Sequence, residues 1–178
     1  ILAAWLFTCV GIVSLAGFSL ESGRLFLRNF LPAEYRDSER VYCALQNPAG
    51  VLYFGTDHRV LEYDGTAWRS WPVAGGAVRG LVHLDDNRMA VAADGALGFL
   101  DSSDGERQYV PLPLPEKTKS GWTSGGAMLD RDQGIVFSTS QGLWRWTDAK
   151  LQSIPLPAGA VGAPTLNASS GGLWVFVR

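Results

Sequence analysis

The chain has 178 residues, of which 47% are hydrophobic, and its formal net charge at pH 7 is −2. This composition excludes a disordered chain, because there is ample apolar surface to bury. The near-neutral charge also argues against a nucleic-acid partner, since binding to phosphates requires a basic face.

The first twenty residues, ILAAWLFTCVGIVSLAGFSL, carry no charge. An uncharged run of about 20 residues is long enough for a transmembrane helix. It also fits the apolar region of a secretory signal peptide, with the small residues Ser14 and Ala16 before a cleavage point at Gly17. A buried helix is a third interpretation. The first two interpretations of residues 1–20 place the remainder of the chain outside the cytoplasm.

Residues 21–40 form a lead-in segment without sustained helical periodicity, in which Pro32 to Glu39 allow one helical turn at most. Cys43 follows this segment in a predicted strand. If a leader that contains Cys9 is cleaved, Cys43 has no partner for an internal disulfide. We therefore interpret Cys43 as a small buried apolar residue.

From residue 41 onward the chain repeats a unit of short predicted strands. The first strand of each unit ends at a polar corner that closes in Gly50, Asn87, Gly134 or Gly171. Gly and Asn at such positions favour tight hairpin turns. The corners are 37, 47 and 37 residues apart, around the period of roughly 40–50 residues that is typical of a four-stranded propeller blade.

The fourth predicted strand of each unit gathers prolines, which are Pro72, Pro111, Pro113, Pro115, Pro155 and Pro157. Because proline cannot donate a hydrogen bond to a ladder, these strands are expected at sheet edges. An immunoglobulin-like sandwich is an alternative all-β fold with short strands and regular turns. It does not require an internal repeat, so the repeat favours a propeller.

The sequence thus predicts an all-β fold, a β-propeller fragment of four-stranded antiparallel blades preceded by an apolar N-terminal helix. Three full blades and part of a fourth are expected, at residues 41–76, 77–115, 122–157 and 161–178. A closed propeller has typically 4–8 blades, so we expect the ring to continue in a longer protein. The run Arg24 to Phe30, RLFLRNF, is a candidate for an extra strand that closes this ring.

The segment NPAGVLYFGTDHRVLEYDGTAWRSWPV, residues 47–73, resembles the two-component regulator propeller repeat. The resemblance spans about residues 22–178 and is sharp only in the first blade. The second blade departs from the pattern at Ala90 to Ala92, and the third lacks the Asp-Gly corner. The positions that match the repeat are Asn47, Gly50, Tyr53, Phe54, Gly55, Thr56, Leu61, Tyr63, Asp64, Gly65 and Trp68.

This resemblance implies a periplasmic, ligand-sensing propeller of a membrane-bound bacterial signal-transduction protein. In such proteins a transmembrane helix and a cytoplasmic output, for example a histidine kinase or a diguanylate cyclase, follow the propeller. The chain itself is then expected to lack enzyme activity, while the full-length protein forms a homodimer and is held in the membrane. The alternatives are an exported propeller enzyme that acts on polysaccharide and a non-catalytic scaffold that binds proteins.

Three residues are the candidates for a ligand site. In the alignment of the units, Tyr42 and Arg79 occupy equivalent positions at the entries to the first strands, and Trp122 lies on the entry loop of the third unit. A phenol ring, a guanidinium group and an indole can together hold a sugar or an anion. The expected ligand is therefore an unidentified small molecule or carbohydrate.

No catalytic constellation and no cofactor motif stands out in the sequence. The chain has two histidines, His58 and His83, in unlike contexts. A zinc site requires three or four convergent ligands, so we predict no metal site.

Overall fold

The computed structural model describes residues 28–35, 40–102, 106–114, 121–130, 134–156, 158, 164–169 and 172–176. The apolar N-terminal helix predicted at residues 1–20 lies outside the described residues. Among the helices that are described, none is long and apolar enough to cross a membrane.

The regular secondary structure of the described chain is β-structure, apart from the single helical turn α1 (Pro32–Tyr35). The first sheet contains β1 (Cys43–Gln46), β2 (Leu52–Gly55), β3 (Arg59–Tyr63) and β4 (Trp68–Pro72). The second contains β5 (Val78–His83), β6 (Arg88–Ala93), β7 (Ala96–Asp101) and β8 (Gln108–Pro111). The third contains β9 (Ser124–Asp130), β10 (Gly134–Thr139), β11 (Gly142–Thr147) and β12 (Lys150–Ile154). A further antiparallel pair is formed by β13 (Thr165–Ser169) and β14 (Gly172–Phe176).

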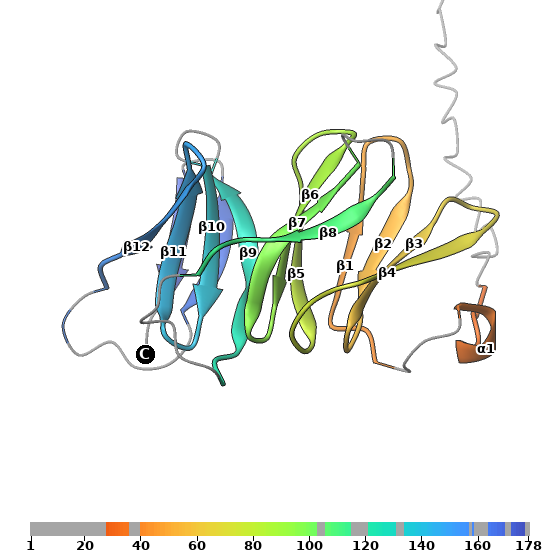
Figure 1. Ribbon diagram of the computed structural model, residues 1–178, viewed down its shortest axis with the longest axis horizontal. Coiled ribbons are helices and arrows are strands. Elements are labelled where there is room, and N and C mark those ends of the chain that lie inside the picture. The colour runs from red at the N-terminus through yellow and green to blue at the C-terminus, as the bar shows by residue number, and fades with distance from the viewer. Residues whose placement is uncertain are drawn as a thin grey trace, which may run out of the picture.

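Within each sheet the strands pair antiparallel in chain order, so the fourth strands β4, β8 and β12 lie at edges. The predicted all-β fold of four-stranded antiparallel sheets is therefore confirmed. Both β4 and β8 end on a proline, Pro72 and Pro111, as expected for edge strands. The three sheets stand side by side in a row, with the first strands of successive sheets in contact (Figure 1).

Two apolar clusters fill the spaces between the sheets. The first lies between the first and second sheets and includes the fully buried Val60, Val78 and Val91. The second lies between the second and third sheets and includes Phe137 and Leu97. Strands that are buried on both faces, such as β6 and β10, are accordingly apolar along most of their length.

The first strands approach one another very closely, and glycine makes this approach possible. A Cβ atom added to Gly80 in β5 would lie 2.4 Å from the backbone nitrogen of Ala127 and 2.7 Å from the Cα atom of Gly126 in β9. Real Cβ atoms do not come this near to backbone atoms, so the spacing of the second and third sheets depends on Gly80.

Cys43 is half-buried in β1, in agreement with its interpretation as a small apolar residue. Its Sγ donates to the carbonyl oxygen of Val78 at 3.4 Å, and burial raises the pKa of the thiol to about 11. The thiolate, which is the nucleophilic form, is therefore scarce at neutral pH.

The segment Arg24 to Phe30, predicted as a ring-closing strand, is described only from Arg28 onward. These last residues are not in a strand. Instead, the ring of Phe30 packs edge-on against Tyr63 and Trp68, at centroid distances of 4.9 Å and 5.1 Å. Residues 28–35, which include α1, thus lie against the outer part of the first sheet (Figure 1).

The Asp-Gly corner between β3 and β4 is held by the carboxylate of Asp64. Its Oδ1 accepts hydrogen bonds from the backbone nitrogens of Ala67 at 2.8 Å and Thr66 at 2.9 Å. These backbone hydrogen bonds, with a smaller contribution from Arg69, lower the pKa of Asp64 from 3.8 to about 2. They favour the ionised carboxylate, so the corner is most stable when Asp64 is charged.

We expect Asp64 to contribute stability that is present above its unfolded pKa of about 3.8 and that is lost as the pH falls toward its folded pKa of about 2. NMR titration of the Asp64 carboxyl carbon measures its pKa in the folded protein. Urea unfolding at a series of pH values measures how the free energy of unfolding changes with pH. The variant Asp64→Asn keeps an acceptor at the corner and should flatten the pH dependence in this window. A carboxyl that titrates at its ordinary pKa would contradict the prediction.

Candidate functional site

Two of the three predicted site residues lie in contact with each other. The guanidinium carbon of Arg79 is 5.0 Å from the centroid of the Tyr42 ring. The hydroxyl group of Tyr42 donates to Oδ1 of Asp57 at 2.7 Å. Arg79 donates to Asp94 through Nε and Nη2, each at 2.9 Å. We call Tyr42, Asp57, Arg79 and Asp94 the loop-end cluster.

The backbone explains why these side chains meet. The pairing of β5 with β6 shifts register between Val78 and Gly80, so Arg79 is the extra residue of a β-bulge. A bulge turns a side chain away from the alternation of its strand. Asp57 and Asp94 lie in the tight loops that follow β2 and β6, at the same end of the sheets.

The charges of the loop-end cluster are largely compensated. The hydrogen bond to Asp94 raises the pKa of Arg79, and Oδ1 of Asp94 also accepts the backbone N–H of Ser124 at 2.7 Å. Tyr42 and Asp57 together raise the pKa of the nearby Arg40. The cluster thus links the first strands of all three sheets. Its guanidinium is held by a carboxylate of the chain itself, which leaves less of it for an anionic ligand.

Trp122, the third predicted site residue, is not part of this cluster. Its side chain is only 3% exposed and packs in the second apolar cluster, with Phe99 and Ile135. A burial of this extent leaves no ring face for a ligand, so the three predicted residues do not form one site.

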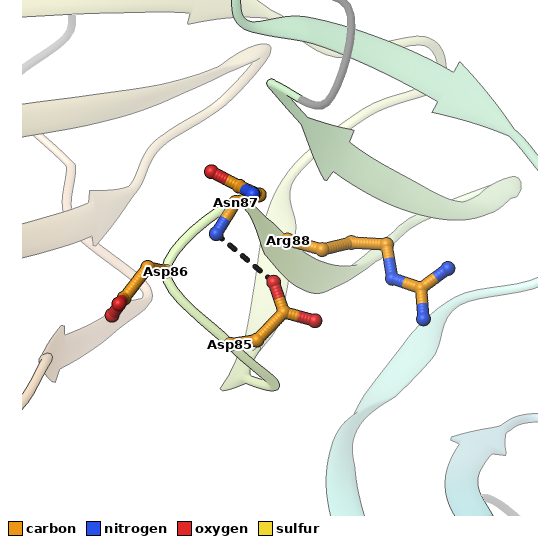
Figure 2. Close-up of a pocket in the computed structure, with 4 residues that line it drawn as sticks. All are labelled: Asp85, Asp86, Asn87 and Arg88. Carbon is orange, nitrogen blue, oxygen red and sulfur yellow. Dashed lines mark hydrogen bonds between the residues drawn. The ribbon is translucent and has the colours of Figure 1, made fainter.

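A different concave region lies at the corner between β5 and β6, where four consecutive residues line a depression of about 350 Å³. The backbone nitrogen of Asn87 donates to Oδ1 of Asp85 at 2.9 Å, which closes the corner. Figure 2 shows that the side chains of Asp86 and Arg88 project to opposite sides of it. The depression therefore offers carboxylate, amide and guanidinium groups within one turn.

A second, narrow pocket lies between the first and second sheets, and we call it the lobe. The lobe has a volume of about 10 Å³ and shares Asp85, Asp86 and Arg88 with the depression. We call the two together the corner cleft. The lobe is also lined by Asn47, Tyr53, His83, Met89, Leu100 and Arg107.

The sequence predicted the turn at Asp85 but not the cleft. His83 is the last residue of β5, and Arg107 immediately precedes β8. The two come together only when the second sheet packs against the first, and the alignment of units carries no signal for that contact. Among the described residues, no group of three or more His, Cys, Asp or Glu is placed to hold a metal ion.

A groove of about 460 Å³ separates α1 from the edge of the first sheet and is lined by Tyr35, Trp68, Arg59 and Arg69, among others. Trp68 already packs against Phe30, Tyr35, Phe54 and Tyr63 at centroid distances of 4.7–5.8 Å. Its ring faces therefore serve the packing of the lead-in segment.

No protein-family model and no curated protein matches the chain. Among solved structures, the chain is similar to the extracellular domain of BT4673 from B. thetaiotaomicron, described as a candidate one component system. The TM-score is 0.64 and the identity 16%, over 83% of this chain and 22% of that one. A second structure of the BT4673 extracellular domain, described as a candidate hybrid two component system, gives a TM-score of 0.46. That match has 16% identity, over 78% of this chain and 25% of that one.

At 16% identity, the similarity to the first of these two structures shows the fold alone. The chain thus spans about a fifth of the length of the domain it resembles.

Proposed function

We propose that the three sheets are consecutive blades of a β-propeller and that the chain is part of the extracytoplasmic, ligand-sensing region of a membrane-bound bacterial signalling protein. The observation that carries the proposal is the likeness to an extracellular domain over 83% of the chain. The side-by-side sheets with adjacent first strands are consistent with blades. The repeat resemblance of residues 47–73 supports the same assignment from the sequence.

In this proposal the chain binds a ligand and catalyses no reaction. The ring continues beyond the blades at residues 41–76, 77–115, 122–157 and 161–178, and the output is a histidine kinase or diguanylate cyclase elsewhere in the protein. Signalling outputs of this kind act as dimers, so we include homodimerisation in the proposal. The protein then has two partners. One is a small molecule or carbohydrate outside the cytoplasm, and the other is the membrane.

Reporter fusions placed directly after the codon of Arg178 in the full gene test the location. Alkaline phosphatase folds to its active form only after export, so this fusion should be active in bacterial cells. A fusion of green fluorescent protein to the same point should stay dark. An inactive phosphatase fusion together with a fluorescent fusion of green fluorescent protein would place residues 41–178 in the cytoplasm and refute the proposal.

A further inference from the structure

One position in the third strand of each sheet has a different chemistry in each sheet. In the first and third sheets this position is fixed by a buried threonine, whose hydroxyl donates to the carbonyl oxygen three residues later. The distance is 3.3 Å for Thr56 and 2.9 Å for Thr139. The residues three further along are Glu62 in β3 and Arg145 in β11. The two sheets thus carry opposite charges at equivalent positions.

The second sheet supplies a partner for Glu62. Nη1 of Arg107 donates to Glu62 at 2.8 Å and to the Tyr53 hydroxyl at 2.9 Å. The guanidinium carbon of Arg107 also lies 5.4 Å from the centroid of the Trp71 ring. The carboxylate at this position of the first sheet is therefore matched by a guanidinium from the next sheet.

The third sheet supplies a partner for the equivalent residue of the second. Ala93 pairs with Ala96 at the start of β7, so the residue three positions after Ala96 is Phe99. The Phe99 ring packs edge-on against Trp146 of β11, at a centroid distance of 5.7 Å. At both interfaces, then, the following sheet provides a side chain whose chemistry complements the residue at this position.

Arg145 lies on the face of the third sheet that looks away from the second. Its neighbours Trp144 and Trp146 pack with the second apolar cluster, and side chains alternate between the faces of a strand. Val136, which pairs with Arg145, lies on the same face as Ser138. Because the hydroxyl of Ser138 donates to the carbonyl oxygen of Pro164, directly before β13, this face is the one that β13 and β14 approach.

The guanidinium of Arg145 is incompletely paired within the described chain. Its Nε is buried and has no hydrogen-bond partner among the described residues. Its Nη2 lies 3.8 Å from Oδ2 of Asp130, which is beyond hydrogen-bond length. Buried polar atoms are nearly always satisfied, so this nitrogen calls for an acceptor. A carboxylate fits best, because its two oxygens match the planar fork of a guanidinium.

We propose that Arg145 pairs with an Asp or Glu of the sheet that begins with β13 and β14. The matching residues at the other two interfaces lie in a third strand, as Trp146 does, or directly before a fourth strand, as Arg107 does. The acidic residue is thus expected in the third strand or the next corner of that sheet, in the segment encoded after Arg178. This inference rests on the proposed propeller and names the chemistry of its next interface.

The experiment is zero-length cross-linking of the full-length protein with a carbodiimide, which joins an amine to a carboxylate in direct contact. The variant Arg145→Lys supplies the amine, and mass spectrometry of the peptides identifies its partner. We expect a cross-link to an Asp or Glu encoded after Arg178. Ser153→Lys is the matched control, because Ser153 is an exposed residue that pairs with Trp144 and so lies on the opposite face. It should give no cross-link to that segment.

Hydrogen exchange on the full-length protein gives a second measurement. Arg145→Met should speed the exchange of the β11 amides about tenfold or more, the effect of losing a hydrogen bond between charged groups.

Three outcomes would overturn the proposed ion pair, provided that circular dichroism shows the variants to be folded. The first is a cross-link from the introduced lysine to Asp130 alone. The second is a cross-link to a second copy of the chain or to another protein instead. The third is unchanged exchange of the β11 amides in Arg145→Met. None of these outcomes alters the reporter fusions, so failure of the ion pair is distinct from failure of the proposed location.

Discussion

Replacing Gly80 with alanine is expected to lower the free energy of unfolding by about 3 kcal/mol, because the new methyl group overpacks a contact between two backbones. The added Cβ would lie 2.4 Å from the nitrogen of Ala127, and backbone atoms of β9 cannot rotate away as a side chain can. Relief requires β5 and β9 to separate, which opens the second apolar cluster around Phe137.

Urea unfolding of Gly80→Ala beside Gly76→Ala tests this prediction. An added Cβ at Gly76 would lie 3.3 Å from Cβ of Asp94 and 3.7 Å from its carbonyl oxygen, so only a small adjustment is needed there. We expect the Gly76 variant to lose no more than about 1 kcal/mol. Equal losses in the two variants would show that the close approach of β5 and β9 is not what makes Gly80 necessary.

The strand order was predictable because residues that favour tight turns mark the corners between the strands. Gly50 and Gly65 have positive φ angles of 85° and 95°, which favour glycine at hairpin turns. The third sheet shows where such signals fail. Its last corner has no glycine, yet Asp148 and Ala149 adopt φ angles of 48° and 57°, so a tight turn forms there without the expected residues. The sheet around it stabilises a conformation that local preference disfavours.

The candidate site was less predictable than the fold. Alignment of the units placed Tyr42 and Arg79 at equivalent positions, and the structure brings the two side chains into contact because adjacent first strands lie side by side. It could not reveal that Arg79 is paired with Asp94, since the bulge that turns Arg79 has no sequence signature. Trp122 was assigned to a ligand site on the entry loop of the third unit, but packing between the second and third sheets buries its side chain.

Packing between sheets likewise determines the polar network around Glu62. The Glu62 side chain is 10% exposed and accepts hydrogen bonds at 2.8 Å from Arg107, which precedes β8 in the second sheet, and from Arg69 in β4 of its own sheet. The side chain of Arg107 is 19% exposed and that of Arg69 is 52% exposed. The Glu62 carboxylate is thus shared by Arg107, which is largely buried and comes from the second sheet, and by Arg69, which is solvated and lies in the first sheet.

We expect Arg107→Met to lower the free energy of unfolding by about 2–3 kcal/mol, somewhat less than the effect of breaking a fully buried pair. The variant keeps apolar contact with Trp71 but leaves the Tyr53 hydroxyl and one oxygen of Glu62 without their donor. Arg69→Met removes a charge from the same carboxylate in a solvated position and should lose less than about 1 kcal/mol.

A double-mutant cycle with Glu62→Gln separates the ion pair from the packing of Arg107. The loss caused by Arg107→Met should shrink when Glu62 is already neutral, because part of the loss is the burial of an unpaired carboxylate. Unchanged stability in Arg107→Met would mean that the apolar cluster alone holds the first two sheets together.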